Sequence, residues 1–269
     1  MDTVAVSART RNDLSELLAE WRVWMEVSRG LLPNTVNLYE RTVEIAAQDI
    51  PDLPAASTEE IEAWVQLKGG KASTVSNRIS ALTSFYRFLV KTKKRSDNPA
   101  AELDRPRRRK GVPKPVRDLE AALSELDRWD AIRERRTGES RDMAVFIAET
   151  GLRISEACSV ALDEPAPAEI TIIGKGAKEA IVLLTPKARE AIDRLGGRIG
   201  IGPRAVQRRF ERASFHPHQL RHWRATSLVR SGTEIGTISK IMRHSSPAIT
   251  MTYAEYATDQ MRSALERAS

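Results

Sequence analysis

Four short segments in the second half of the chain place cationic, imidazole and phenol side chains at close spacing. The segments are TGLRISE at 150–156, GKGAK at 174–178, HPHQLRH at 216–222 and RHSS at 243–246, and Tyr253 follows His244 by nine residues. Guanidinium groups bind phosphate oxygens through charged, directional hydrogen bonds. The set as a whole therefore favours a site for a phosphate oxyanion.

The third segment suits the start of a helix. Pro217 fits the first helical turn, where its missing N–H has no partner to lose. His218 and Arg221, three residues apart, would then share one face near the positive end of that helix. Residues 204–230 contain seven Arg against one acidic residue, Glu211, which supports an anion-binding surface.

Each segment alone has a simpler explanation. An Arg after a glycine turn is usually solvated, a Lys in a hairpin turn is usually only a turn residue, and a His or Tyr in a helix usually packs in a core. GKGAK also lacks the G-x-x-x-x-G-K-[ST] spacing of a phosphate-binding loop. The prediction depends on the ordered combination of the four segments.

The elements that must position these groups begin with residues 1–102, which have the periodicity of four helices. A second helix begins after Pro33, a third begins at a Ser57 cap, and a fourth steps from Val75 to Leu89 at spacings of three and four. The apolar stripe of the first helix consists of Leu14, Leu17, Leu18, Trp21, Trp24 and Met25. We therefore expect a small four-helix domain.

The other face of the fourth helix is polar. It carries Lys71, Thr74, Asn77 and Arg78. These side chains are either solvated or, on a basic protein, lie in a DNA groove.

Residues 103–116, LDRPRRRKGVPKPV, are expected to form an extended linker between two domains. The segment has six Lys or Arg, one Asp and three Pro, so it can neither fill a core nor form a regular helix. A solvated basic loop is the simpler explanation, but the position and composition favour DNA contact. The basic residues of its centre are Arg107, Arg108, Arg109 and Lys110.

Residues 117–269 are predicted to be mainly helical with one β interruption. Ile170–Ile173 and Ile181–Leu184 flank a glycine-containing turn, a pattern typical of a β-hairpin. Pro186 then opens a further helix. The fold class expected is mainly α, with a small β-hairpin in the C-terminal domain.

Composition limits the function classes. The 269 residues are 41% hydrophobic and 29% charged, a globular balance, and their net charge is +7. A pI of about 9.7 points to a polyanionic partner, nucleic acid before a membrane surface. The sequence contains no apolar run of bilayer length or signal-peptide type, which predicts a cytoplasmic protein. One Cys and four His exclude an intramolecular disulfide framework and argue against a Cys-rich zinc module.

The four segments, in this order and at this spacing, resemble the catalytic boxes of the tyrosine recombinase (phage integrase-like) family. TGLRISE resembles the first Arg box, GKG the hairpin Lys, PHQLRH the His-x-x-Arg box, and HSSPAITMTY the last box, which ends in the nucleophilic Tyr. The helical N-terminal part, DNPA at 97–100 and the basic linker are similar to the family's SAM-like core-binding domain and interdomain strap. The resemblance covers nearly the whole chain.

The resemblance implies a role for each matched residue. Arg153 and Arg221 would bind the scissile phosphate, Tyr253 would attack phosphorus, and His218 would be the general base. The remaining assignments are Lys175 as general acid for the 5′-oxygen, His244 as a phosphate hydrogen-bond donor, and Glu156 and His222 as supporting residues. No metal and no other cofactor are implied.

Three alternatives stay open within this pattern. Lys178 could replace Lys175 as the acid, Tyr256 lies almost one helical turn after Tyr253, and His216 has no assigned role. The sequence also departs from the family pattern at Met242-Arg243, where Leu-Gly is frequent before the His. This departure adds one cation.

The resemblance implies site-specific DNA recombination through a 3′-phosphotyrosine and a Holliday junction. The expected partners are double-stranded DNA core sites and three further copies of the chain in a synaptic tetramer, with a monomer in solution and no membrane. A location at the nucleoid of a bacterial or archaeal host cell follows. A type IB topoisomerase-like enzyme and a non-catalytic DNA-binding accessory protein are the alternatives. The C-terminal stretch 258–269 packs either on its own domain or on a neighbouring subunit.

Overall fold

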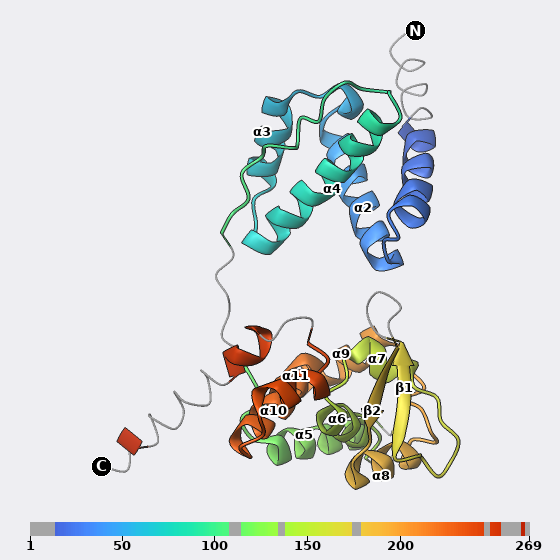
Figure 1. The fold of residues 1–269 in the computed structure, drawn as a ribbon, viewed down its shortest axis with the longest axis vertical. Helices are drawn as coiled ribbons and strands as arrows, with labels where there is room; N and C mark the ends of the chain where they lie inside the picture. Colours follow the sequence, from blue (N-terminus) through green and yellow to red (C-terminus); the bar gives the residue numbers. More distant parts are fainter. Residues whose placement is uncertain are drawn as a thin grey trace. The chain divides into compact units, whose positions relative to one another are not determined.

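The computed structural model divides into two compact units, Met1–Lys110 and Gly111–Ser269. It describes residues 14–107, 114–133, 138–173, 179–244, 248–253 and 265–266. Figure 1 shows the helices and strands of both units.

The first unit is a bundle of helices. Residues 14–23 are helical and continue into a π-helical turn, η1 (Trp24–Ser28). The elements that follow are α2 (Pro33–Asp49), the 3-10 turn η2 (Leu53–Ala55), α3 (Thr58–Lys68) and α4 (Ala72–Lys91). The four predicted helices are therefore present in the described residues. The π-helical turn was not predicted, because the wider bond from the Arg29 N–H to the Trp24 carbonyl leaves no mark on apolar periodicity.

Large aromatic side chains fill the core of the first unit. Trp21 packs edge-on against Phe85, with ring centroids 5.3 Å apart, and both are fully buried. The buried Tyr86 hydroxyl donates to the Leu53 carbonyl at 2.6 Å, which ties α4 to η2. Ser57 caps α3 as predicted: its side chain accepts from the Glu60 N–H, and the Glu60 carboxylate accepts from the Ser57 N–H.

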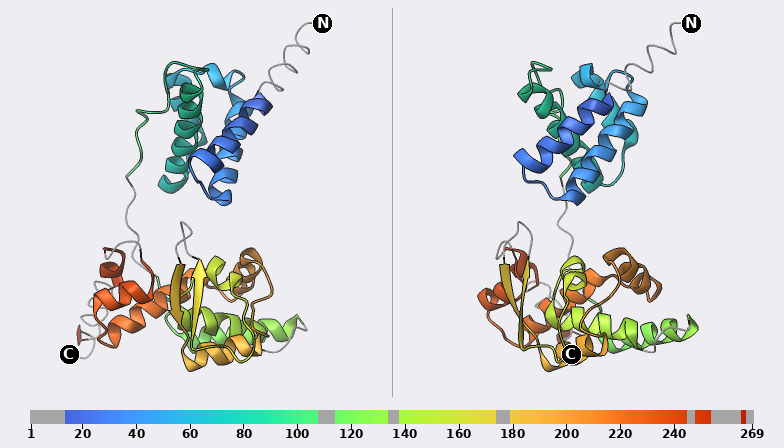
Figure 2. Two further views of the ribbon diagram at one scale, coloured as in Figure 1. Left: turned by 45° about the vertical axis from the view of Figure 1, so that its right-hand side comes forward. Right: turned by 90° about the vertical axis from the view of Figure 1, so that its right-hand side faces the viewer.

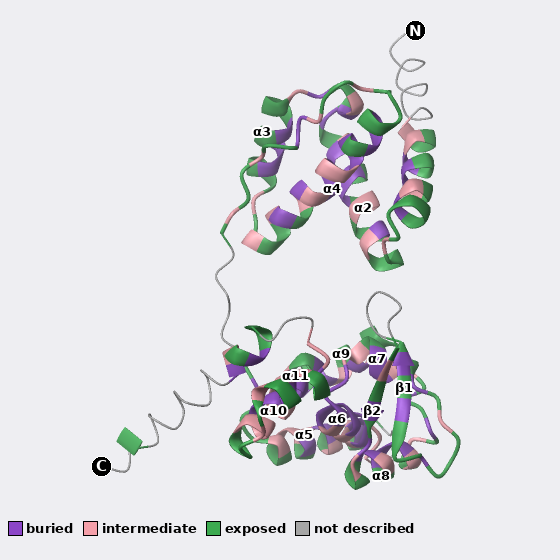
Figure 3. Ribbon diagram, viewed as in Figure 1, coloured by how far each residue is buried: buried purple, intermediate pink, exposed green. Residues whose placement is uncertain are grey.

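The second unit is also mainly helical and is built around α6 (Glu139–Thr150). This helix packs against α5 (Leu119–Ile132), α8 (Pro186–Arg194) and α10 (Pro217–Arg230), and Figure 3 colours most of it as buried. The shorter elements are α7 (Ile154–Ser159), α9 (Pro203–Arg212), α11 (Ile235–Ile241) and a helical stretch at 248–253. No helix in the described parts of the chain is both long and apolar enough to cross a bilayer.

The predicted β-hairpin is present as β1 (Glu169–Ile173) and β2 (Glu179–Leu183), which lie antiparallel (Figure 2). Ile170 pairs with Val182, and both face the core. The second strand begins two residues and ends one residue earlier than predicted, at Leu183. The Leu184 N–H still bonds to the Ala168 carbonyl at 2.8 Å, in the same register as the strand pairs. The turn at 174–178, with Lys175 and Lys178, lies outside the described residues.

The ends of the basic segment are each attached to one unit. Leu103 packs against the core of the first unit, and Arg105 donates to the Ser80 hydroxyl at 2.8 Å. Val116 is buried in the core of the second unit, and its N–H bonds to the Gln219 carbonyl. The division between the units lies between these two anchors.

Candidate active site

Arg153 and Glu156 form a pair at the start of α7. The Arg153 N–H donates to Glu156 Oε2 at 2.8 Å, and Arg153 Nη1 donates to Oε1 at 2.7 Å. Burial opposes ionisation of Glu156, but these two hydrogen bonds and the charges of Arg153 and Arg243 outweigh it and lower the pKa of the carboxyl. Glu156 is therefore an anion, and its side chain is 7% exposed whereas that of Arg153 is 37% exposed.

Arg221 is almost fully buried on α10 and joins three elements. Its two terminal nitrogens donate to the carbonyls of Gly151, at the end of α6, and Met242, after α11. Burial, with help from the charges of Arg153 and Arg243, lowers the pKa of Arg221 to about 10, so the group stays charged at neutral pH. The two carbonyls fix the guanidinium in position.

Gly151 occupies a position that favours glycine. Its φ is +61°, and a Cβ there would lie 2.9 Å from Met242 Sδ. The turn thereby brings the Gly151 carbonyl to Arg221 and leads directly into Arg153.

Two histidines of α10 stand one helical turn apart. The rings of His218 and His222 meet edge to face with centroids 4.7 Å apart. His222 Nδ1 lies 2.6 Å from the Tyr253 hydroxyl oxygen. His222, rather than His218, therefore contacts the tyrosine in this structure.

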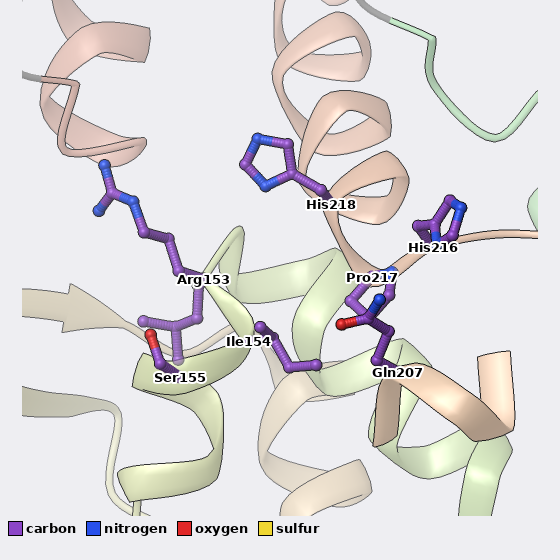
Figure 4. A pocket seen from close by; sticks show the side chains of 8 residues that line it. Arg153, Ile154, Ser155, Gln207, His216, Pro217 and His218 are labelled. Carbon is purple, nitrogen blue, oxygen red and sulfur yellow. The ribbon is translucent and has the colours of Figure 1, made fainter. Parts of the chain in front are cut away.

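His218 and Arg153 line a hollow of about 370 Å³ beside α10. Figure 4 shows the Arg153 guanidinium and the His218 ring reaching in the same direction, while His216 lies on the opposite side of Pro217. His216 is exposed, and its N–H is capped by the Gln219 side chain at 2.8 Å. The structure thus places His216 at the start of α10, where it lines the same hollow as Arg153 and His218 but from the other side of Pro217.

His244 is held against Tyr253 by a residue that the sequence did not single out. Its ring stacks parallel to that of Tyr253, with centroids 5.8 Å apart, and its Nδ1 lies 2.8 Å from Thr250 Oγ1. Thr250 is fully buried. No motif spacing indicates this pair, because it depends on how residues 248–253 fold back toward α11.

The electrostatics of the site favour neutral imidazoles and a protonated phenol. Burial lowers the pKa of His222 and of His244 to about 4, and nearby cations add to the effect. Burial also lowers the pKa of His218, with smaller contributions from Arg221 and Arg153. Burial raises the pKa of Tyr253, although the charge of Arg221 opposes it. At neutral pH the Tyr253 proton would need a base, and the neutral imidazoles beside it can accept one.

Arg243 brings a third guanidinium into the same region. Its Nη2 lies 3.4 Å from the Gly151 carbonyl oxygen and 3.5 Å from Glu156 Oε2. Its φ is +50°, in the left-handed region that glycine adopts without steric strain. This conformation suits the glycine that is frequent at this position in the family pattern, and the departure to Arg243 adds a cation to the site.

The structure thus brings together most of the predicted catalytic residues. Arg153, Arg221 and the supporting Glu156 are linked through the Gly151 turn and Arg243, while His222 and His244 contact Tyr253. Lys175 and the alternatives Lys178 and Tyr256 lie outside the described residues.

The predicted DNA-binding residues are placed less uniformly. Lys71 and Thr74 are exposed at the start of α4, and Arg107 is exposed in the basic segment. Arg78 is half-buried, donates to the Gly69 carbonyl and lies over the Trp64 ring. Arg108, Arg109 and Lys110 lie outside the described residues.

Comparison with known sequences agrees with this site. The phage integrase family matches residues 200–260, and the phage integrase N-terminal SAM-like domain matches residues 7–93. Tyrosine recombinase XerC of Chromobacterium violaceum is 30% identical over 262 residues, which cover 83% of this chain and 85% of that protein. XerC of Vibrio atlanticus is 26% identical over 96% of this chain and 94% of its own length.

Comparison with solved structures concerns the fold. A lambda integrase dimer bound to a COC′ core site superposes with a TM-score of 0.70 at 18% identity, covering 89% of this chain and 94% of that one. The Tn1549 transposon integrase in complex with circular intermediate DNA gives 0.58 at 18% identity, with 88% and 94% covered. The fold is that of a SAM-like domain followed by an integrase catalytic domain. With its four ordered boxes and its XerC relatives, the chain belongs to the tyrosine recombinase family.

Proposed function

We propose that this chain cuts and rejoins DNA strands at specific core sites through a 3′-phosphotyrosine intermediate and a Holliday junction. The observation that carries the proposal is the setting of Tyr253. Its hydroxyl lies 2.6 Å from His222, its ring stacks on His244, and the charge of Arg221 reaches it. A phenol so placed, among cations and neutral bases, is a nucleophile for phosphorus.

In the proposed reaction the Tyr253 oxygen attacks the scissile phosphorus, and the bond from phosphorus to the 5′-oxygen breaks. Arg153 and Arg221 bind the non-bridging oxygens and stabilise the charge of the pentacoordinate transition state. His218 accepts the phenol proton, His244 donates a hydrogen bond to the phosphate, and Lys175 protonates the leaving 5′-oxygen. The products are a 3′-phosphotyrosine and a 5′-hydroxyl, and attack by a second 5′-hydroxyl reverses the step.

Glu156 and His222 support the reacting groups. Glu156 pairs with Arg153 at 2.7 Å and so fixes its direction. His222 holds the Tyr253 hydroxyl before DNA arrives. Neither residue needs to exchange a proton with the DNA.

The first unit and the basic segment supply DNA contacts in this proposal. The domains are taken as 1–102 and 117–269, with a linker at 103–116. Three residues at the start of α4 lie in a DNA groove: Lys71, Thr74 and Arg78. Four residues of the linker bind DNA phosphates: Arg107, Arg108, Arg109 and Lys110. The partner is a double-stranded core site, as in the DNA complex of the lambda integrase. The chain is a monomer in solution, assembles as a tetramer on two sites, and works at the nucleoid in the cytoplasm.

The test is the formation of a covalent protein–DNA adduct on a suicide substrate, which traps the phosphotyrosine after the 5′ fragment diffuses away. Host-genome fragments serve as substrate until the core site is known. Wild type, Tyr253→Phe and Tyr256→Phe are compared with EDTA present. We expect adducts from wild type and Tyr256→Phe and none from Tyr253→Phe, because Tyr253 is the tyrosine placed against His222 and His244.

Other patterns would change the assignment. Loss of the adduct only in Tyr256→Phe would move the nucleophile by almost one helical turn. If no protein forms an adduct on a DNA that it binds, the chain is an accessory binder. Adducts accompanied by DNA relaxation without recombinant products would indicate a topoisomerase.

A further inference from the structure

Arg243 occupies a backbone position at which glycine would be more stable. Its φ of +50° crowds any Cβ, and its side chain is only 13% exposed, so a guanidinium is withdrawn from water as well. Both features destabilise the folded chain. The contacts of the Arg243 side chain must therefore explain why arginine is present at this position.

Those contacts lead to the two arginine boxes. Nη1 donates to the Ile241 carbonyl at 3.0 Å, and Nη2 faces the carbonyl of Gly151, which also accepts from Arg221. The same Nη2 lies 3.5 Å from Glu156 Oε2. Nε is buried and has no hydrogen-bond partner in the described part of the chain.

Glu156 is thus shared between two guanidinium groups. Its Oε1 accepts from Arg153 Nη1, and its Oε2 accepts from the Arg153 backbone N–H and faces Arg243. Arg243 is the more deeply buried of the two arginines, whereas Arg153 is 37% exposed and lines the hollow with His218. Arg153 is therefore placed to reach a phosphate, and Arg243 is placed to stay with the carboxylate.

We propose that Arg243 is a positioning residue that neutralises Glu156 and thereby frees the outer edge of Arg153 to bind the scissile phosphate. This inference rests on the proposed recombinase function. Without Arg243, Arg153 would be the one arginine in ion-pair contact with the buried carboxylate in the described part of the chain, and the attraction would hold its guanidinium back from the DNA. Glycine, the usual residue here in the family pattern, would lack this second cation.

The test is a double-mutant cycle on the rate of adduct formation at saturating suicide substrate. Arg243→Gly and Arg243→Lys are each made in the wild-type and Glu156→Gln backgrounds. We expect Arg243→Gly to slow cleavage about tenfold and to have less than about a twofold effect once Glu156 is uncharged, because the two residues then no longer interact. Arg243→Lys keeps the charge, so most of the rate returns.

The pH dependence of the cleavage rate distinguishes an electrostatic role of Arg243 from a packing role, because a change in packing alone would not shift it. The cations that face Glu156 are Arg153, Arg221 and Arg243, and removing one of them raises the pKa of the carboxyl. The acid limb of the cleavage rate in Arg243→Gly should therefore move to higher pH than in wild type. Thermal unfolding checks that the variant folds: relief of the left-handed backbone strain stabilises Arg243→Gly, and the loss of the contact with Glu156 opposes that gain.

Ser214→Gly is the matched control. Ser214 also has a positive φ, of +62°, in the second unit, but it lies in an exposed turn outside the site. This variant should gain the same backbone relief and keep the wild-type cleavage rate and pH profile.

Two results would overturn the inference. An equal loss from Arg243→Gly in both backgrounds would mean that Arg243 acts without Glu156, for example on the phosphate itself. An unchanged rate and pH profile in Arg243→Gly would mean that it has no part in cleavage. Both differ from a failure of the proposed function, in which wild type itself forms no adduct.

Discussion

At the scale of single residues, the site favours the protonated form of Tyr253, the proposed nucleophile. Tyr253 is 2% exposed, and burial raises the pKa of its phenol. The nearest base is His222, while His218 lies one turn away along α10 and lines the hollow beside Arg153. In the proposed mechanism His222 orients the hydroxyl and His218 takes its proton.

Asparagine substitutions distinguish the two roles. An Asn side chain can replace the hydrogen bond made by a histidine Nδ1, but it cannot accept a proton at neutral pH. We expect His222→Asn to cleave within about threefold of wild type and His218→Asn to lose a factor of about 10²–10⁴, the usual contribution of a general base. The measurement is the single-turnover rate of adduct formation.

His222→Phe completes this comparison, since it fills the space without a hydrogen bond. It should slow cleavage more than His222→Asn does. A loss in His222→Asn as large as that in His218→Asn would show that His222 is the base, and the assignment of His218 would then be wrong.

The residues with local sequence signals could be found without the structure. Arg153 and Glu156 are three apart on one helix turn, and His218, Arg221 and His222 lie on one stretch of α10. The contact of Arg243 with Gly151, 92 residues away, depends on how the ends of α6 and α11 meet, and the contact of His244 with Thr250 depends on how residues 248–253 fold back toward α11. Spacing along the chain contains no information about such contacts.

At the scale of elements, helix starts were predictable and exposed faces were not. Pro217, Pro186 and the Ser57 cap mark helix starts, and helices begin at 217, 186 and 58. The β-hairpin was also predicted, yet half of its apolar residues, including Ile173 and Ile181, face away from the core. Alternation along a strand shows which residues share a face but not which face is covered.

The turn after α6 provides a test at this scale. Ala at position 151 must adopt a φ of +61° and must also push against Met242 Sδ, which would lie 2.9 Å from its Cβ. We expect Gly151→Ala to lower the free energy of unfolding by about 2–4 kcal/mol, the strain and the overpacking together. Cleavage should fall as well, because the Gly151 carbonyl holds Arg221. Urea unfolding and adduct formation measure the two effects.

Gly232→Ala separates strain from overpacking. Gly232 has a φ of +79°, and a Cβ added there would meet no atom within 4 Å, so its substitution should cost only about 1 kcal/mol and leave cleavage unchanged. Equal stability losses at 151 and 232 would show that the contact with Met242 contributes nothing.

At the scale of the whole molecule, composition predicted a linker between two domains. The packing of each unit shows more closely where that linker begins and ends. Pro and like charges predicted an extended segment at 103–116. Leu103 and Val116 nevertheless each join the core of one unit, because a single apolar residue at each end can be buried even where the segment between cannot. Among the charged residues between these anchors, Arg107 is exposed in the described part of the chain, and we propose that it contacts DNA.

This placement predicts how binding responds to salt. Each phosphate that the protein neutralises releases condensed counterions, so the slope of log Kd against log salt falls by about 0.9 for each phosphate left unneutralised. Arg107→Gln should reduce that slope by about one and weaken binding to all sequences alike. Arg128→Gln, an equal change of charge at an exposed position of α5, should leave the slope as it is in wild type. If both variants shift the slope equally, net charge rather than the basic segment governs binding, and the proposed phosphate contact of Arg107 is wrong.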